Sequence, residues 1–204
     1  MQVAIAGNIG AGKTTLTQLL AKHYHWDAHF ENAEDNPYLD DFYAEMERWS
    51  FNLQVFFLNS RFEQILKIQK SGKDIIQDRT IYEDAKIFAP NLHAMGLLTN
   101  RDYNNYSSLF DLMENLVTPP DLLIYLRADI KTLVGQIHKR GRAYENSISI
   151  DYLSRLNERY EAWATEYDKG KILIIDVDNL DFVENQEDLG KIIDRIDAQI
   201  HGLF

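Results

Sequence analysis

Cysteine is missing from the chain, and basic residues are scarce in it. Without cysteine, none of the 204 residues can form a disulfide bond or a thiolate metal site. The 21 Lys and Arg residues are outnumbered by 32 Asp and Glu residues, so the formal net charge is −11. A nucleic-acid-binding protein needs a basic face, and we therefore expect no nucleic acid partner.

Long apolar runs, internal repeats and low-complexity segments are absent as well. No run approaches the roughly 20 residues of a membrane span, so we expect no membrane partner. No secretory signal fits before the glycine-rich motif that begins at Gly7, and the lack of cysteine suits a cytoplasmic protein. The length predicts one domain over residues 1–204.

Residues 7–14 read GNIGAGKT and match the phosphate-binding loop pattern G-x-x-x-x-G-K-[ST] in full. An apolar stretch at 3–6 predicts a strand before the loop, and an amphipathic pattern at 15–22 predicts a helix after it. Glycines let the backbone N–H groups point into one concavity and bind phosphate oxygens. We expect Lys13 to reach the β- and γ-phosphates of ATP, and the Thr14 hydroxyl to ligate Mg²⁺. The expected nucleotide-binding residues of this loop are Gly7, Asn8, Ile9, Gly10, Ala11, Gly12, Lys13, Thr14 and Thr15.

Short apolar stretches alternate with amphipathic helical patterns along the rest of the chain. Further strands are predicted at 26–30, 74–77, 121–126 and 171–175. Helices are predicted at 39–49, 51–70, 81–95, 100–117, 129–139, 151–167 and 183–200. Nearly continuous apolar strands separated by helices predict an α/β fold, a five-stranded parallel sheet with helices on both faces.

Charged residues follow two of the predicted strands. In open α/β sheets, ligands bind beyond the carboxyl ends of the strands. Glu31, Glu34 and Asp35 follow the second strand, where they compete for a functional role or form a solvated acidic loop. Asp78 follows the third strand and is expected to hold the Mg²⁺ shell, directly or through water. Its neighbour Arg79 is suited to pair with a carboxylate or a phosphate.

A basic loop follows the helix predicted at 129–139, with three cations around Gly141. The cations could complement the helix dipole. Beside a phosphate-binding loop, we favour a lid over about residues 139–148, in which Arg140 and Arg142 close over ATP and stabilise the transferring phosphoryl group.

Two helical faces carry a mixture of polar and aromatic residues. Gln54, Phe57 and Arg61 share a face of the helix predicted at 51–70, since they are spaced at i, i+3 and i+7. Asp84 and Phe88 are four residues apart and also face the same way. The first set suits either a polar surface or the recognition of a planar polar ligand.

The chain resembles the deoxynucleoside kinases, in the branch with deoxyadenosine, deoxyguanosine and deoxycytidine kinases, and it is most similar to bacterial deoxyadenosine kinases. The resemblance runs nearly from end to end. It rests on the order and spacing of the residues at 7–14, 31, 34–38, 78–80, 125–127 and 140–142. It implies a P-loop kinase fold with an arginine-bearing lid.

The resemblance also implies a role for each matching residue. Glu31 would take the proton from the deoxyribose 5′-hydroxyl, although Asn32-Ala33 follow it where many relatives have Pro-Val. Arg79 would contact the 5′-oxygen and support Glu31. The implied catalytic residues are Glu31, Arg79, Lys13, Arg140 and Arg142.

For the substrate, the resemblance implies that Tyr43 and Glu145 bind the 3′-hydroxyl, that Gln54 hydrogen-bonds the base and that Phe88 stacks on it. The implied substrate-binding residues are Glu31, Tyr43, Gln54, Phe57, Arg61, Arg79, Asp84, Phe88 and Glu145.

Arg61 and Asp84 bear on specificity, because the thymidine-accepting branch has apolar residues at these two positions. An ionised Asp84 only accepts hydrogen bonds, so it suits an exocyclic amine, and Arg61 can hold it. Thymine would leave Asp84 without a partner, and a buried polar group without a partner rejects the ligand strongly.

The implied activity is ATP- and Mg²⁺-dependent phosphorylation of a deoxynucleoside 5′-hydroxyl in nucleotide salvage. Deoxyadenosine is the first expected substrate, with deoxyguanosine and deoxycytidine next. The resemblance also implies a homodimer, packed through helices near residues 51–70.

Two other functions compete with this interpretation. A nucleoside monophosphate or thymidylate-type kinase would need cations near the acceptor, whereas residues 31–47 are strongly acidic. A non-kinase nucleotide switch of the GTPase type should carry an Asn-Lys-x-Asp motif, and the chain has none.

Overall fold

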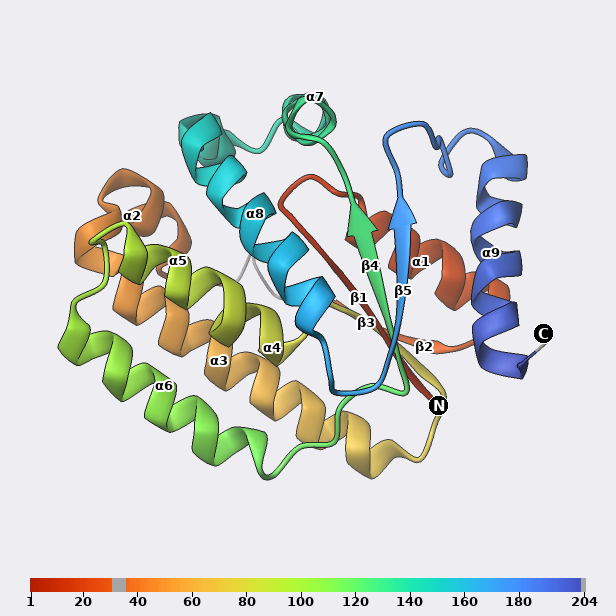
Figure 1. The fold of residues 1–204 in the computed structure, drawn as a ribbon, viewed down its shortest axis with the longest axis horizontal. Coiled ribbons are helices and arrows are strands. Elements are labelled where there is room, and N and C mark those ends of the chain that lie inside the picture. Colours follow the sequence, from red (N-terminus) through yellow and green to blue (C-terminus); the bar gives the residue numbers. More distant parts are fainter. Residues whose placement is uncertain (31–35, 203–204) are drawn as a thin grey trace.

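Five parallel strands form one sheet in the computed structural model, which describes residues 1–30 and 36–202 (Figure 1). The strands are β1 (Gln2–Gly7), β2 (Asp27–His29), β3 (Ile75–Asp78), β4 (Leu122–Arg127) and β5 (Lys171–Asp176). Their order in the sheet is β2-β3-β1-β4-β5, and every neighbouring pair is parallel. The predicted α/β fold and parallel sheet are confirmed, and each predicted strand overlaps an observed one.

The central strand is β1, and it is buried because its side chains are apolar on both faces. Val3 pairs with Ile76 of β3 on one side and with Leu122 of β4 on the other. The residues from Val3 to Ala6 have no exposed surface. The chain adds β2 and β3 on one side of β1 and β4 and β5 on the other, so the order of the strands reverses at β1. The crevice at such a reversal is where open α/β sheets bind ligands.

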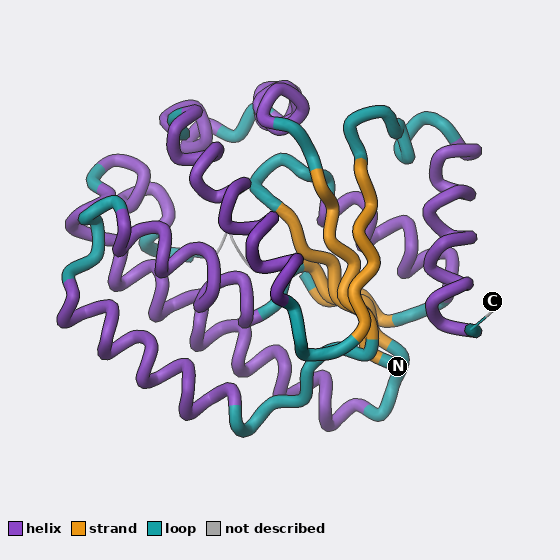
Figure 2. Tube along the Cα trace, in the orientation of Figure 1, coloured by secondary structure: helices purple, strands orange, loops and turns teal. Residues whose placement is uncertain are grey.

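Helices cover both faces of the sheet, as predicted (Figures 1 and 2). One face packs against α1 (Lys13–Tyr24) and α9 (Gln186–His201), through residues such as Leu16 and Ile192. The longer helices of the other face include α3 (Met46–Ser71), α6 (Asn100–Glu114) and α8 (Ile150–Glu166). The remaining helices are α2 (Leu39–Ala44), α4 (Ile81–Glu83), α5 (Ala89–Ala94) and α7 (Ile130–Arg140). No helix in the described part of the chain is long and apolar enough to cross a membrane.

The break between the second and third helices differs from the prediction. The sequence predicts helices at 39–49 and 51–70, with a break at Ser50, but the chain breaks at Glu45 (φ −145°, ψ 77°). Ser50 lies inside the 26-residue helix α3, where its hydroxyl donates to the Met46 carbonyl at 2.6 Å. A serine hydroxyl bonded to the carbonyl four residues earlier is tolerated in a helix interior, so Ser50 does not end it.

The helix predicted at 81–95 is divided into three segments. A five-residue π-helical turn, Asp84–Phe88, separates α4 from α5. Such turns are rare in proteins and frequent at functional sites. The helix predicted at 183–200 also starts later, at Gln186, because the Asn185 side chain accepts a hydrogen bond from the Glu187 N–H and caps the helix there.

Candidate active site

A pocket opens near the carboxyl ends of β1 and β3. It encloses about 750 Å³ of space between atoms, part of which is open to solvent. Its walls come from the loop after β1, from α2 and α3, from the π-helical turn and from the basic loop after α7. The lining residues are Ile9, Gly10, Lys13, Thr14, Leu39, Phe42, Tyr43, Leu53, Gln54, Phe57, Arg79, Asp84, Phe88, Arg140, Arg142, Tyr144, Glu145 and Tyr152.

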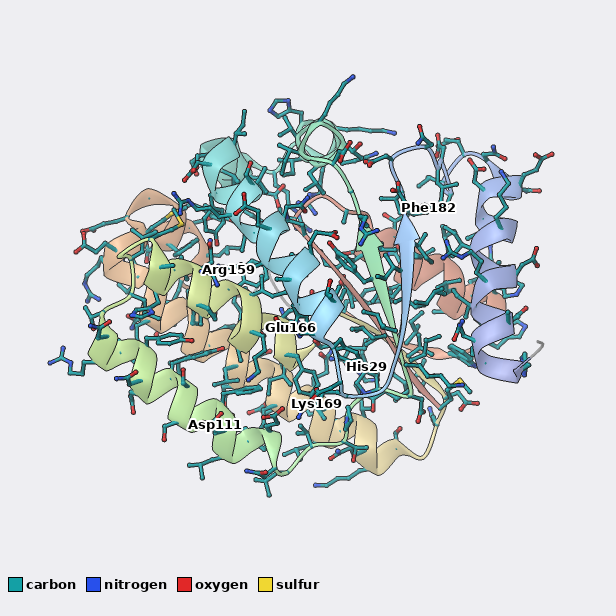
Figure 3. The ribbon with its side chains drawn as sticks, viewed as in Figure 1. His29, Asp111, Arg159, Glu166, Lys169 and Phe182 are labelled. Carbon is teal, nitrogen blue, oxygen red and sulfur yellow. The ribbon has the colours of Figure 1, made fainter. Side chains whose placement is uncertain are left out.

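The loop after β1 requires glycine at two positions. Gly10 has a φ of 88°, and a Cβ there would lie 2.7 Å from the Leu133 carbonyl oxygen. Gly12 has a φ of 89°, and a Cβ there would lie 2.9 Å from Phe182, which follows β5 (Figure 3). Lys13 opens α1, and its Nζ donates to the Asn8 carbonyl at 3.0 Å. The loop therefore has the strand, glycine and helix context in which backbone N–H groups bind phosphate.

Thr14 and Asp78 meet beside this loop. The Thr14 hydroxyl donates to Asp78 Oδ2 at 2.5 Å. Asp78 is 2% exposed, and its Oδ1 has no hydrogen-bond partner among the described residues. No cluster of three or more His, Asp or Glu residues suited to a metal occurs within 1–30 and 36–202. A hydroxyl and one carboxylate fit Mg²⁺, which keeps several waters and takes further oxygens from substrate phosphates.

Arg79 turns into the pocket directly after β3. Its φ of 74° is unusual for a residue other than glycine, and such backbone conformations occur where a site imposes them. Its guanidinium lies 4.8 Å from the centre of the Phe88 ring. Its Nη1 donates to the Tyr160 hydroxyl at 2.7 Å and to Glu83 Oε1 at 3.3 Å.

The polar faces of α3 and of the π-helical turn come together. Gln54 lines the pocket and is 2% exposed, and its Oε1 has no hydrogen-bond partner among the described residues. Arg61 donates from Nε to Asp84 Oδ2, and each of these side chains is 3% exposed. Asp84, Phe57 and Phe88 line the pocket, whereas Arg61 lies behind Asp84. These groups are buried, so they do not form a solvated polar surface.

The basic loop lies against α2 over the pocket. Arg140 donates from Nε to Glu145 Oε2 at 3.0 Å and from Nη2 to Glu145 Oε1, and Glu145 is 4% exposed. Arg142 Nη1 lies 3.9 Å from the same carboxylate. Tyr144 stacks on Tyr43 of α2, with ring centroids 5.6 Å apart. The loop is thus part of the pocket and does not merely end a helix.

The structure gathers most of the predicted site residues around one pocket. Arg61 and Asp78 do not line it, but they contact Asp84 and Thr14, which do. The predicted loop residues that do not line it are Gly7, Asn8, Ala11, Gly12 and Thr15. Glu31, Glu34 and Asp35 lie outside the described residues, so the position of the predicted base stays a prediction.

Comparison with known proteins identifies the family. The profile of the deoxynucleoside kinases matches residues 3–201. The chain belongs to the deoxynucleoside kinase family. Its enzyme class is therefore that of a kinase acting on deoxynucleosides, and the monophosphate kinase and nucleotide switch alternatives are not supported.

Individual relatives agree with this assignment. The chain is 38% identical to a deoxyadenosine/deoxycytidine kinase of Bacillus subtilis (strain 168), over 98% of this chain and 93% of that protein. It is 39% identical to a deoxyadenosine kinase of Dictyostelium discoideum, over 91% of this chain and 75% of that protein. The structure of a deoxyadenosine kinase from M. mycoides with products dCMP and dCDP bound superposes with a TM-score of 0.85 at 32% identity, covering 97% of this chain and 100% of that one. The P-loop kinase fold is therefore confirmed.

Several residues of this kinase's site are missing from the sequence-based prediction. Tyr144 and Tyr152 line the pocket, and Glu83 and Tyr160 hold Arg79 from behind. For Glu83 a local signal exists, since Thr80 three residues earlier makes the S/T-x-x-E pattern of a capping box. Tyr144 lies within the predicted lid, between Arg142 and Glu145, but no local pattern marks it. Tyr152 and Tyr160 come from α8, which is distant in sequence from the phosphate-binding loop.

Gly10→Ala tests the geometry of the phosphate-binding loop. The added Cβ would clash with the Leu133 carbonyl and would force alanine into a left-handed conformation. We expect a loss of at least about 1 kcal/mol in the free energy of unfolding and a weaker affinity for ATP, measured by urea unfolding and equilibrium binding. Gly135→Ala is the matched control, because its Cβ would meet nothing within 4 Å on helix α7. This control should gain roughly 0.5–1 kcal/mol of stability and keep normal ATP affinity; equal ATP affinity in the two variants would contradict the prediction.

Proposed function

We propose that this deoxynucleoside kinase transfers the γ-phosphoryl group of ATP to the 5′-hydroxyl of deoxyadenosine in nucleotide salvage, with deoxyguanosine and deoxycytidine as further substrates. The observation that carries the proposal is the buried Arg61–Asp84 pair beside Gln54, in a pocket bordered by the phosphate-binding loop. An ionised Asp84 accepts from an exocyclic amine, which adenine, guanine and cytosine carry and thymine does not. Gln54 Oε1, which has no partner within residues 1–30 and 36–202, offers a second acceptor at the same base.

On the donor side, the loop at residues 7–15 binds the phosphates of ATP and Lys13 reaches the β- and γ-phosphates. When bound, Mg²⁺ neutralises charge on these phosphates. Thr14 would hold the ion, and Asp78 would do so directly or through water. Support comes from the short Thr14–Asp78 contact and from the unpartnered Asp78 Oδ1. A related M. mycoides deoxyadenosine kinase, 29% identical, has been solved with bound dATP.

On the acceptor side, Tyr43 and Glu145 hold the 3′-hydroxyl and Phe88 stacks on the base. Glu31 accepts the proton of the 5′-hydroxyl as the 5′-oxygen forms its bond to the γ-phosphorus. The bond from that phosphorus to ADP breaks in line, and ADP leaves. Arg79 contacts the 5′-oxygen. Positioning and electrostatics supply most of the rate enhancement in this type of reaction.

The lid, about residues 139–148, completes the site. Arg140 and Arg142 stabilise the charge on the transferring phosphoryl group. Both cations face the Glu145 carboxylate in this structure. They therefore exchange a carboxylate partner for phosphate oxygens when ATP is bound, while Glu145 turns to the sugar.

The proposal extends to the whole chain. Residues 1–204 form one kinase domain, and two copies form a homodimer through helices near residues 51–70. Leu112 and Leu116, which are 67% and 65% exposed, support the dimer, because they lie along α6 and just beyond it, and α6 packs beside α3. We place the protein in the cytoplasm, which suits a chain without cysteine.

The test of the function is ADP release with ATP and Mg²⁺ and a panel of acceptors. We expect turnover with deoxyadenosine and, more weakly, with deoxyguanosine or deoxycytidine. For thymidine, kcat/KM should be lower by about 10²-fold or more, because thymine has no exocyclic amine to donate to Asp84. Activity on deoxynucleoside monophosphates alone would overturn the proposal.

Glu31→Gln tests the base. The amide cannot accept the proton, so kcat should fall by about 10²–10⁴-fold while the affinity for ATP stays unchanged. Glu34→Gln and Asp35→Asn are matched controls from the same acidic loop, and they should keep normal turnover. If one of the controls loses turnover and Glu31→Gln does not, the base is assigned to the wrong carboxylate.

The double variant Arg61→Met, Asp84→Ala tests base recognition. Removing both charges together leaves no unpaired buried ion. The preference for deoxyadenosine over thymidine, as a ratio of kcat/KM values, should fall by about tenfold or more. Arg48→Met, at an exposed arginine of α3, is the control and should keep the ratio. An unchanged ratio in the double variant would show that the base is read elsewhere.

A further inference from the structure

Glu83, a carboxylate that plays no part in the proposed mechanism, is completely buried behind the pocket. Its Oε1 accepts from the Gly7 N–H at 3.3 Å, from Arg79 Nη1 at 3.3 Å and from the Tyr160 hydroxyl at 2.8 Å. Its Oε2 accepts from the Thr80 N–H at 2.7 Å and from the Thr80 hydroxyl at 3.3 Å. One side chain thus receives five hydrogen bonds and gives none, which is the pattern of an ionised carboxylate.

Tyr160 adds an indirect path from Arg79 to the same oxygen. Its hydroxyl accepts from Arg79 Nη1 at 2.7 Å and donates to Glu83 Oε1. Burial raises the pKa of this hydroxyl well above its ordinary value, so the phenol keeps the proton that it donates. Arg79 is therefore held by Glu83 both directly and through Tyr160.

A helix cap accounts for only two of these five contacts. The capping box of α4 uses Oε2, which binds the Thr80 N–H. The other oxygen, Oε1, joins the start of the phosphate-binding loop at Gly7 to the guanidinium of Arg79. Arg79 also needs such support, because its backbone is held at a φ of 74° and its side chain is 6% exposed.

We propose that Glu83 is a positioning residue that sets the orientation of Arg79 toward the acceptor oxygen. The inference rests on the proposed function, in which Arg79 contacts the 5′-oxygen. Glu83 itself touches no substrate, and it acts on the reaction through Arg79. Its link to the Gly7 N–H fixes Arg79 relative to the loop that holds the donor phosphates, so that acceptor and donor meet in line.

Glu83→Gln keeps the shape of the side chain and removes its charge. Each oxygen of Glu83 contacts groups that can only donate. These are the Gly7 N–H and the Arg79 guanidinium at Oε1, and the Thr80 N–H at Oε2. The amide NH₂ therefore faces a donor in either orientation, and Arg79 shifts. We expect kcat to fall by about 10²-fold, with the KM values for ATP and deoxyadenosine changed by less than about threefold.

The decisive test is a double-mutant cycle with Arg79→Ala. If Glu83 acts through Arg79, Glu83→Gln should lower kcat/KM by less than about threefold in the Arg79→Ala background. A residue with a merely structural role would lower kcat/KM by the same factor in both backgrounds, and that additivity would overturn the inference. A raised KM for ATP with normal kcat would also overturn it, because Glu83 would then serve the phosphate-binding loop instead.

Tyr160→Phe provides the same cycle if Glu83→Gln fails to fold, as judged by circular dichroism and thermal unfolding. It removes only the hydroxyl that lies between Arg79 and Glu83. We expect kcat to fall by about tenfold, and we expect this loss to disappear in the Arg79→Ala background. A loss of equal size in both backgrounds, or no loss at all, would overturn the inference.

Glu161→Gln is the matched control. Glu161 also accepts from a tyrosine and an arginine, Tyr125 and Arg127, but none of these three lines the pocket. Its kcat should stay within about twofold of the wild type. The turnover of the wild type separates the proposed function from this inference. If the wild type is inactive on every deoxynucleoside, both are overturned. If the wild type is active and Glu83→Gln has the same kcat, only this inference is overturned.

Discussion

The burial of β1 between β3 and β4 is the constraint on which the site depends. Because the three strands are parallel and in register, their carboxyl ends lie at one edge of the sheet. The phosphate-binding loop leaves β1 at this edge, and Asp78 ends β3 opposite Ile5 of β1. The contact from Thr14 to Asp78 and the contacts from Glu83 to both strand ends follow from this placement.

Much of this architecture can be predicted from the sequence, because the relevant signals are local. Apolar stretches marked the strands β1, β3, β4 and β5, and the motif at residues 7–14 located the phosphate-binding loop. The residues Gln54, Phe57, Asp84 and Phe88 could be placed on shared helical faces by their spacing alone, and the structure brings them to one pocket. The family followed from motifs in a fixed order, and the match over residues 3–201 confirms it.

The features that could not be predicted depend on particular polar contacts, some local and some between distant segments. Ser50 looks like a helix break, but a bond to its own helix lets α3 continue through it. Tyr160 reaches Arg79 from α8, which is distant in sequence. The pairing of Arg140 with Glu145 depends on how the basic loop folds over α2. Hydrophobic periodicity carries no information about such polar contacts across the fold.

The π-helical turn at Asp84–Phe88 makes the length of this segment as important as its composition. Each residue of an α-helix advances the chain by about 100°, so the extra residue of a π turn shifts the helical phase by roughly that angle. Ile81 before the turn and Leu92 after it are both fully buried, and Asp84 and Phe88 of the turn line the pocket. Deleting one residue here would restore a regular helix and rotate either the pocket-lining side chains or the core side chains out of place. Among related sequences, insertions and deletions should therefore be excluded from this segment even where individual residues vary.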